Sequence, residues 1–454
     1  MSESLYIVGG TVLTMNAAME VIENGVVEVL DGKIQQVGSA ESVPVPQGAR
    51  TLDAKHCLVL PGFINGHTHT GMGLIRGIAE DLPFDQWLND VILPTEKRWG
   101  SPEFVYTGTL LSCAEMIKAG TTTFNDMYHF EEASARAANT IGMRGICAQD
   151  LSAITWEGEK AGTVAERMDE FRASLSGFSR VTPALGPHAI YTVDRPMFEE
   201  LIAYAGENDL LVHMHLSETK EEVRRCLREN NQTPPEYCKT LGLFDVKTVC
   251  AHGTCLSPAD IALLAEHRVG IIHNPESNLK LETKICPVPE LRHAGVAVGL
   301  GTDSVASNND LDLLQEADTA AKLQTYRKGI GTLTAQDTVR MMTIDGARAL
   351  RMDSWVGSLE VGKQADIVCI DVNKPNAVPL YNPYAQLVYS STGADAKHTL
   401  VEGELLMEDY RLTRIDEQAL LEEARAWGKR IYADYHKPAG QSRGNRGPQD
   451  NALH

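Results

Sequence analysis

The sequence lacks a long apolar run and lacks paired cysteine motifs. None of its 454 residues falls in a stretch of about twenty apolar residues that could span a membrane, and the opening MSESLYIVGG is too short and polar for a secretory signal. Its nine cysteines are scattered and include no CxxC pair, which favours free thiols in a reducing compartment over a disulfide framework. We therefore expect a cytoplasmic protein with no membrane partner.

Basic residues are scarce relative to acidic ones. Lysine and arginine number 41 against 61 aspartates and glutamates, so the formal net charge is −20. Nucleic acid would be repelled by that charge, and we expect none as a partner. The motifs HExxH, GxxxxGK[ST], GxSxG and GxGxxG are also missing, as is the HxE…PCxxC pattern of cytidine deaminases. The sequence therefore gives no support for a phosphate-binding loop, a nucleophile elbow or a dinucleotide-binding site.

Eight short β-like segments alternate with amphipathic helical stretches in the middle of the chain. Eight such units in a row predict an α/β fold, a closed (β/α)8 TIM-like barrel over residues 59–356, with an open doubly wound sheet as the alternative. The segments are CLVLPGFIN, TTTFNDM, RGICAQ, VTPALGP, LLVHMH, KTVCAH, VGIIHN and VAVGLG.

Strand-rich sequence flanks this middle part on both sides. Residues 1–58 and 357–412 read as short strands separated by turns, and we expect them to form one small β-sandwich domain. An amphipathic helix follows over residues 413–437. The last residues, 438–454, are rich in Gly, Pro and Asn and predict a disordered tail.

Polar, metal-capable side chains stand at nearly every predicted strand end. Such residues would fill a structural core poorly, and the carboxyl ends of barrel strands are where active sites lie. In chain order these residues are His67, His69, Asp126, Gln149, His188, His215, His252, His273 and Asp303.

His67 and His69 are separated by one residue in an extended segment, so both can reach one ion from the same side. His215 ends the fifth strand and is a third candidate ligand, whereas His213 is interpreted as a histidine of the barrel interior. Asp303 follows VGLGT; we interpret it as a metal ligand, with a helix N-cap as the alternative.

Glu218 comes three residues after His215 and can lie beside a metal without binding it, which suits a proton shuttle. His252 could hold a metal hydroxide or the developing charge of a substrate, or be a structural histidine. For His273 the functional and the structural interpretations are evenly balanced.

Several of these segments together resemble the aminohydrolase branch of the amidohydrolase superfamily. They are PGFINGHTH, HLSET, CAHG, HNPESNLKL, GTDSVASNN and SLEVGKQADIVCID, and the resemblance covers residues 1 to about 435. Two-metal members carry a carboxylated lysine at the fourth strand end, where this chain has Gly186-Pro187-His188. The resemblance therefore implies one divalent metal ion per chain, with zinc expected and iron or manganese as alternatives. Its ligands would be His67, His69, His215 and Asp303.

The segment GLIRGIAEDLPFDQWLNDVILPTEKRW is similar to the one that closes over the ribose in 5′-methylthioadenosine/S-adenosylhomocysteine deaminases. This resemblance implies a purine nucleoside substrate, with Glu96 on the ribose hydroxyls, Trp87 packing nearby and His188 at the purine ring. Members that hold the homocysteine carboxylate carry an arginine near the position of Gln149, and an amide cannot pair with a carboxylate as a guanidinium does. We therefore favour methylthioadenosine over S-adenosylhomocysteine, with adenosine as a further candidate. The family also implies a homo-oligomer, a dimer or tetramer.

The reaction implied is hydrolytic deamination by a metal-bound hydroxide that attacks C6 of the adenine ring. Asp303 would take the proton of the water, Glu218 would protonate N1, and His252 would steady the oxygen, giving an inosine-type product and ammonia. The alternatives are another aminohydrolase, acting on guanine, 8-oxoguanine or triazines, and a non-catalytic scaffold on the same barrel.

Overall fold

The computed structural model describes residues 3–152, 156–159 and 161–435. The predicted disordered tail, residues 438–454, lies outside the described residues. None of the described helices is both long enough and apolar enough to cross a bilayer.

Eight parallel strands form the predicted barrel, each hydrogen-bonded to the next in chain order. The first and last strands meet through a bridge between Thr68 and Asp303, where the Asp303 amide donates to the carbonyl of His67 over 3.0 Å. The predicted α/β barrel is therefore confirmed. Its strands are β6 (Phe63–Thr68), β7 (Thr121–Tyr128), β8 (Arg144–Asp150), β9 (Val181–Gly186), β10 (Val212–Leu216), β11 (Thr248–His252), β12 (Gly270–His273) and β13 (Val298–Leu300).

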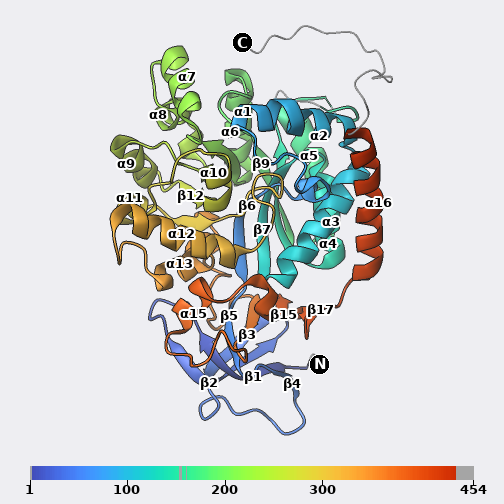
Figure 1. Ribbon diagram of the computed structural model, residues 1–454, viewed down its shortest axis with the longest axis vertical. Helices are drawn as coiled ribbons and strands as arrows, with labels where there is room; N and C mark the ends of the chain where they lie inside the picture. Colours follow the sequence, from blue (N-terminus) through green and yellow to red (C-terminus); the bar gives the residue numbers. More distant parts are fainter. Residues whose placement is uncertain (1–2, 153–155, 160, 436–454) are drawn as a thin grey trace.

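Helices surround the barrel (Figure 1). Each packs its apolar face against the outer face of the strands, and the two form one apolar core. Several begin at a Ser, Thr or Asp whose side chain accepts the first free amides, as Thr163, Asp194 and Ser257 do. The principal ones are α3 (Pro102–Lys118), α4 (Glu131–Ile141), α5 (Val164–Ser174), α6 (Arg195–Asn208), α7 (Lys220–Asn230), α8 (Pro234–Leu241), α9 (Pro258–Glu266), α10 (Pro275–Lys280), α11 (Val288–His293), α12 (Leu313–Lys328), α13 (Ala335–Met341) and α14 (Ile344–Ala349).

A second, nine-stranded mixed sheet is built from both ends of the chain and lies below the barrel in Figure 1. It has its own apolar core, which includes Ile7, Val27, Val59, Ile367 and Leu400. The pairing of the two chain ends is as predicted, although the strands share one hydrogen-bonded sheet. They are β1 (Leu5–Leu13), β2 (Val21–Leu30), β3 (Lys33–Ser39), β4 (Arg50–Asp53), β5 (Cys57–Pro61), β14 (Ile367–Asp371), β15 (Ala396–Val401), β16 (Glu404–Glu408) and β17 (Arg411–Leu412).

The run CLVLPGFIN, interpreted from the sequence as one barrel strand, is in fact two strands. Residues 57–61 pair with β1 and β14 in the mixed sheet, and only residues 63–68 join the barrel. Gly62 lies between them, where a Cβ atom would approach Thr122 Cγ2 to 2.1 Å, so the chain can pass there only without a side chain. The barrel therefore begins a few residues later than predicted.

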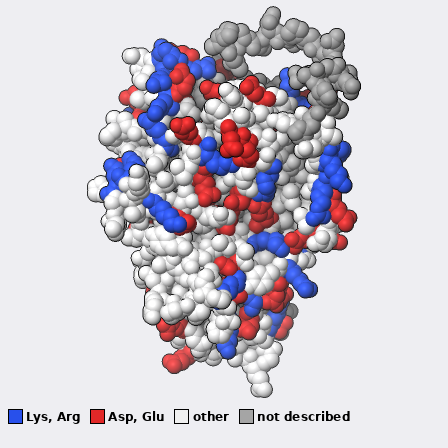
Figure 2. Space-filling view, in the orientation of Figure 1, with Lys and Arg blue, Asp and Glu red and all other residues white. Residues whose placement is uncertain are grey.

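Two connections between elements bear on the site. The C-terminal helix α16 (Glu417–Tyr435) packs along α3, and Trp427 contacts Trp99 at the end of α2 (Leu93–Trp99). The segment between β6 and α3, which also includes η1 (Thr70–Ile75), α1 (Phe84–Gln86) and η2 (Trp87–Ile92), covers the carboxyl end of the barrel. On the described part of the face in Figure 2, acidic and basic side chains are intermixed.

Candidate metal and substrate site

Four side chains converge at the carboxyl end of the barrel. Asp303 Oδ1 lies 3.4 Å from His67 Nε2 and 3.3 Å from His69 Nε2, and His69 Nε2 lies 3.2 Å from His215 Nε2. Two ligands of one tetrahedral ion bound at roughly 2.0–2.1 Å are separated by about 3.3–3.4 Å. These distances are compatible with one divalent ion held by His67, His69, His215 and Asp303, and the ligand set stays a prediction.

Each of the three histidines is held by its other ring nitrogen. Nδ1 of His67 lies 2.9 Å from His213 Nε2, Nδ1 of His69 lies 2.6 Å from the Met127 carbonyl, and Nδ1 of His215 lies 3.0 Å from the His188 carbonyl. These contacts leave each Nε2 facing the common point, the arrangement typical of metal-binding histidines. His67 Nε2 is buried without a hydrogen-bond partner, which a bound cation would supply.

The carboxylate of Asp303 is oriented in the same way. Its Oδ2 accepts a hydrogen bond from Ser277 Oγ over 2.6 Å, so that Oδ1 faces the histidines. Burial alone would raise the pKa of Asp303, but the rings of His67 and His69, whose Nε2 atoms lie 3.4 and 3.3 Å from Oδ1, hold it well below its usual range. The backbone of Asp303 has φ 59°, a left-handed conformation that is uncommon for a residue with a side chain and typical of functional sites.

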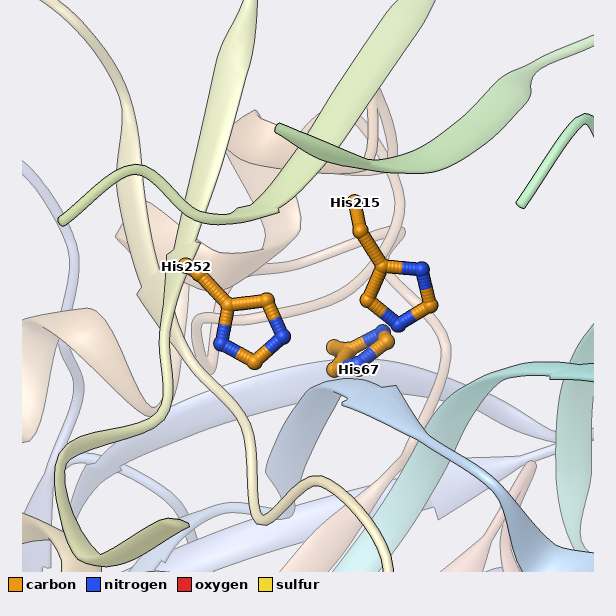
Figure 3. Close-up of side chains that lie close together, drawn as sticks. All are labelled: His67, His215 and His252. Atoms are coloured by element: carbon orange, nitrogen blue, oxygen red, sulfur yellow. The ribbon is translucent and has the colours of Figure 1, made fainter. Parts of the chain in front are cut away.

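His252 faces the same point from the end of β11. Figure 3 shows its ring close to those of His67 and His215, and the three lie near enough to share an ion. The side-chain amides of Asn274 and Asn278 lie 3.3 and 3.0 Å from its Nδ1. If those amides donate, Nδ1 is the acceptor and the proton of the neutral ring is on Nε2, directed at the site. Burial lowers the pKa of His252 to about 3, which keeps the ring neutral.

Glu218 lies beside this group and outside the ligand set. Its Oε1 is 3.8 Å from His252 Nε2, and its backbone amide donates to Glu222 Oε2 over 2.7 Å. Burial, together with the nearby charges of Asp303 and Glu222, raises the pKa of Glu218 well above its usual value. A carboxyl group that keeps its proton at neutral pH is suited to donate it.

The cavity above these groups contains the residues predicted to contact the substrate. Glu96, Trp87 and His188 all line it. Glu96 is buried and accepts a hydrogen bond from Tyr128 Oη over 2.6 Å, while the Trp87 indole donates to the carbonyl of Ala306. Burial and the neighbouring histidines lower the pKa of His188 to about 3, so its ring is neutral.

Gln149 is not among the described residues that line this cavity, so the structure gives no support to its predicted contact with the substrate. Its side chain lies in a separate hollow with Phe130, Arg167 and Phe171. Successive residues of a strand point to opposite sides, and it is the next residue, Asp150, that faces the cavity.

Four further lining residues with ionisable side chains were not singled out from the sequence: Tyr128, His129, Asp150 and Tyr191. Tyr128 and His129 directly follow the predicted second strand end, Asp126, so that position was the available signal. Asp126 itself accepts hydrogen bonds from the amide and hydroxyl of Thr70, which fixes the chain directly after His69. His213 likewise supports a ligand, His67, and is absent from the sets that could hold an ion.

Residues 58–406 match the amidohydrolase family. The chain is similar to a 5-methylthioadenosine/S-adenosylhomocysteine deaminase of Thermodesulfovibrio yellowstonii, with 41% identity over 431 residues that cover 92% of this chain and 97% of the relative. It is also similar to a 5'-deoxyadenosine deaminase of Methanothermobacter thermautotrophicus, with 39% identity. That match covers 94% of this chain and 98% of the relative.

Solved structures of deaminases are also similar to this chain. An adenosine deaminase from Xanthomonas campestris with bound zinc has a TM-score of 0.91 and 36% identity, covering 94% of this chain and 98% of its own. The guanine deaminase of E. coli, at 23% identity and a TM-score of 0.78, shares the fold; the match covers 90% of this chain and 99% of its own.

Proposed function

The chain belongs to the amidohydrolase family, and from this premise we propose that it hydrolyses the 6-amino group of 5′-methylthioadenosine, giving the inosine-type product and ammonia. One observation carries the proposal: three of the four proposed ligands (His69, His215 and Asp303), together with Glu218 and His252, line the same cavity as Glu96. A proton donor, a candidate ion site and a buried carboxylate for hydroxyl groups therefore face one substrate. The similarity to nucleoside deaminases supports the same reaction.

We assign His67, His69, His215 and Asp303 as ligands of one divalent ion, with zinc as the proposed metal. The zinc in the Xanthomonas relative supports this choice. Iron and manganese also accept nitrogen and carboxylate ligands, so metal analysis decides among them. When bound, the ion supplies Lewis-acid activation of water at neutral pH.

The chain's own residues then move the protons. Asp303, held as a carboxylate, accepts a proton from the attacking water. Glu218, which keeps its proton, donates it to ring nitrogen N1, and His252 donates a hydrogen bond from Nε2 to the oxygen that adds at C6. Asp303 then passes the proton from the water to the 6-amino group, and the C6–N bond breaks to release ammonia. The proton of the added hydroxyl returns to Glu218 as the C6 carbonyl forms. General acid–base assistance of this kind contributes about 10²–10⁴-fold to the rate.

Binding of the nucleoside uses the other side of the cavity. Glu96 accepts hydrogen bonds from the ribose hydroxyls, Trp87 packs against the sugar, and His188 contacts the purine ring. Glu96 is already bonded to Tyr128, the Trp87 indole to the Ala306 carbonyl and the His188 ring to the Thr192 hydroxyl. Little ordering of these side chains is therefore required when substrate binds.

The test is ammonia release by purified protein of measured metal content. Methylthioadenosine, adenosine, S-adenosylhomocysteine, guanine and a triazine are compared in parallel. Turnover of methylthioadenosine above guanine and the triazine is expected; turnover of a free base or triazine alone would overturn the nucleoside assignment. Loss of activity on chelation and its return with zinc are expected, and activity without metal would overturn the ligand assignment.

We also propose a cytoplasmic homo-oligomer, a dimer or tetramer. The nine cysteines, eight of them buried and all free thiols, support a reducing compartment. Light scattering of the purified protein gives the mass; a monomer across the working concentrations would contradict the oligomer.

A further inference from the structure

Three ionisable side chains lie together at one end of the cavity and have no part in the reaction. They are His129, which follows β7, Asp150, which ends β8, and Glu159. His129 and Asp150 line the cavity directly, and all three side chains are at most 11% exposed. We call them the His129 cluster.

The cluster is rigidly built. His129 Nδ1 lies 2.8 Å from Glu159 Oε1 and 3.7 Å from Asp150 Oδ2, while Glu159 Oε2 accepts the Trp156 amide over 2.7 Å. The Trp156 ring stacks on the imidazole at 3.7 Å between centroids. Asp150 accepts the hydroxyl of Ser152 over 3.0 Å. Every member is therefore positioned before a ligand arrives.

Its position relative to the substrate follows from Tyr128. The Tyr128 ring lies 6.5 Å from His69 on one side, and 6.0 Å from His129 and 5.6 Å from Trp156 on the other. Tyr128 also holds Glu96. If C6 of the base lies at the metal set and the ribose hydroxyls bind Glu96, the His129 cluster is the polar end of the cavity that remains for the 5′ substituent.

The charge of this end is negative. Burial opposes protonation of His129, but the hydrogen bond to Glu159 and the charge of Asp150 raise its pKa overall. Burial raises the pKa of Asp150 overall, against the charge of His129 and the hydrogen bond from Ser152. With both carboxyl groups ionised, one imidazolium and two carboxylates give the cluster a formal charge of −1. No lysine or arginine is found among the described residues that line the cavity. Arg167 lies in the neighbouring hollow and donates to the backbone carbonyl of Asp150. From there its charge acts on both Asp150 and Glu159 and lowers the pKa of each carboxyl group.

We propose that the His129 cluster is the subsite for the 5′ substituent, and that it selects neutral or positively charged substituents and disfavours carboxylates. This inference rests on the proposed deaminase function. It names adenosines with a 5′-alkylthio or 5′-aminoalkylthio group as the substrate class. The homocysteine group carries both an ammonium and a carboxylate, so we expect its kcat/KM to lie between those of a purely cationic and a purely anionic 5′ substituent.

The experiment compares kcat/KM for ammonia release from three nucleosides of similar size. They carry at the 5′ position a methylthio group, a 2-aminoethylthio group or a carboxymethylthio group. The ammonium compound is expected to exceed the carboxylate compound by roughly tenfold or more, since the two differ by two charges close to a net negative group. The same series is run with Asp150→Asn and with Glu132→Gln.

Asp150→Asn removes one negative charge inside the cavity and is expected to reduce the preference for ammonium over carboxylate to within about threefold. Glu132→Gln removes the same charge from an exposed position in the neighbouring hollow and should leave the preference unchanged. If Asp150→Asn fails to fold, the preference of the unaltered protein is itself decisive. Turnover of methylthioadenosine with no preference, or with the carboxylate preferred, overturns this inference alone. No turnover of any of the three overturns the deaminase function as well.

Discussion

Glu218 is a carboxyl group placed where water cannot stabilise its charge. It is 6% exposed, and the neighbouring carboxylates of Asp303 and Glu222 add to the cost of ionisation. A glutamine side chain has nearly the same shape and can still form hydrogen bonds through its amide group, but it has no acidic proton to donate to a substrate.

We expect Glu218→Gln to retain the metal and the fold while kcat falls by about 10²–10⁴-fold. The measurement is kcat for ammonia release beside metal content and the circular dichroism spectrum. Glu132→Gln, exposed on α4, serves as the matched control. A variant with near-normal kcat would remove Glu218 from its role as proton donor.

His213 acts on the metal site through another residue. It orients His67 by a ring-to-ring contact of 2.9 Å, deep in the barrel where neither side chain is exposed. We expect His213→Ala to weaken metal affinity by about 10–100-fold, as loss of such outer partners does.

Competition with a chelator measures this effect, and activity at saturating metal should recover in part. His293→Ala, an exposed histidine of α11, is the control. Unchanged metal affinity in His213→Ala would assign His213 to packing alone.

At the scale of the element, β8 shows what the sequence can and cannot indicate. All seven of its residues are buried, because the barrel covers one face and helices cover the other. No alternation of polar and apolar residues therefore reveals which side chains face the cavity, and Gln149 was chosen where Asp150 faces it.

Other features could be predicted because they do not depend on such detail. The number of βα units indicated the barrel, and the spacing of His67 and His69 indicated two rings that face one point, where both lie beside Asp303. The boundary near Gly62 was missed because one apolar run continues from the mixed sheet into the barrel without a polar break. The His129 cluster was missed because its members meet only in the folded chain.

The orientation of β8 makes a prediction for Gln149→Arg. Because residue 149 faces the outer hollow, a guanidinium there should leave the ratio of kcat/KM for S-adenosylhomocysteine to that for methylthioadenosine unchanged. The assay is the same ammonia release, with Asp150→Asn as the variant that should alter the ratio. A clear rise in the ratio for Gln149→Arg would mean that residue 149 reaches the substrate.

At the scale of the whole molecule, a histidine buried in the barrel links stability to pH. His273 is fully buried and neither ring nitrogen has a hydrogen-bond partner, and burial lowers its pKa to about 3. In the unfolded chain its pKa is about 6.5. The unfolded state therefore binds the proton first, so stability is complete above pH 6.5 and falls as the pH drops from 6.5 towards 3.

We expect His273→Met, which fills similar space without titrating, to lose less stability on acidification. The difference between the two proteins should grow by about 2 kcal/mol between pH 7.5 and pH 5. Urea unfolding of the metal-free proteins at both pH values measures it. Parallel losses in the two proteins would show that His273 does not control this dependence.

The mixed sheet can be completed only late in the synthesis of the chain. Pro61 in β5 pairs with Ile367 in β14, so a growing chain exposes the edge of β5 long before its neighbour exists. At roughly 5–20 residues per second, the ribosome needs roughly 15–60 s to make the residues in between. Throughout that interval β5 lacks one of its two neighbouring strands, and an unpaired apolar strand edge is a site at which a chain can aggregate.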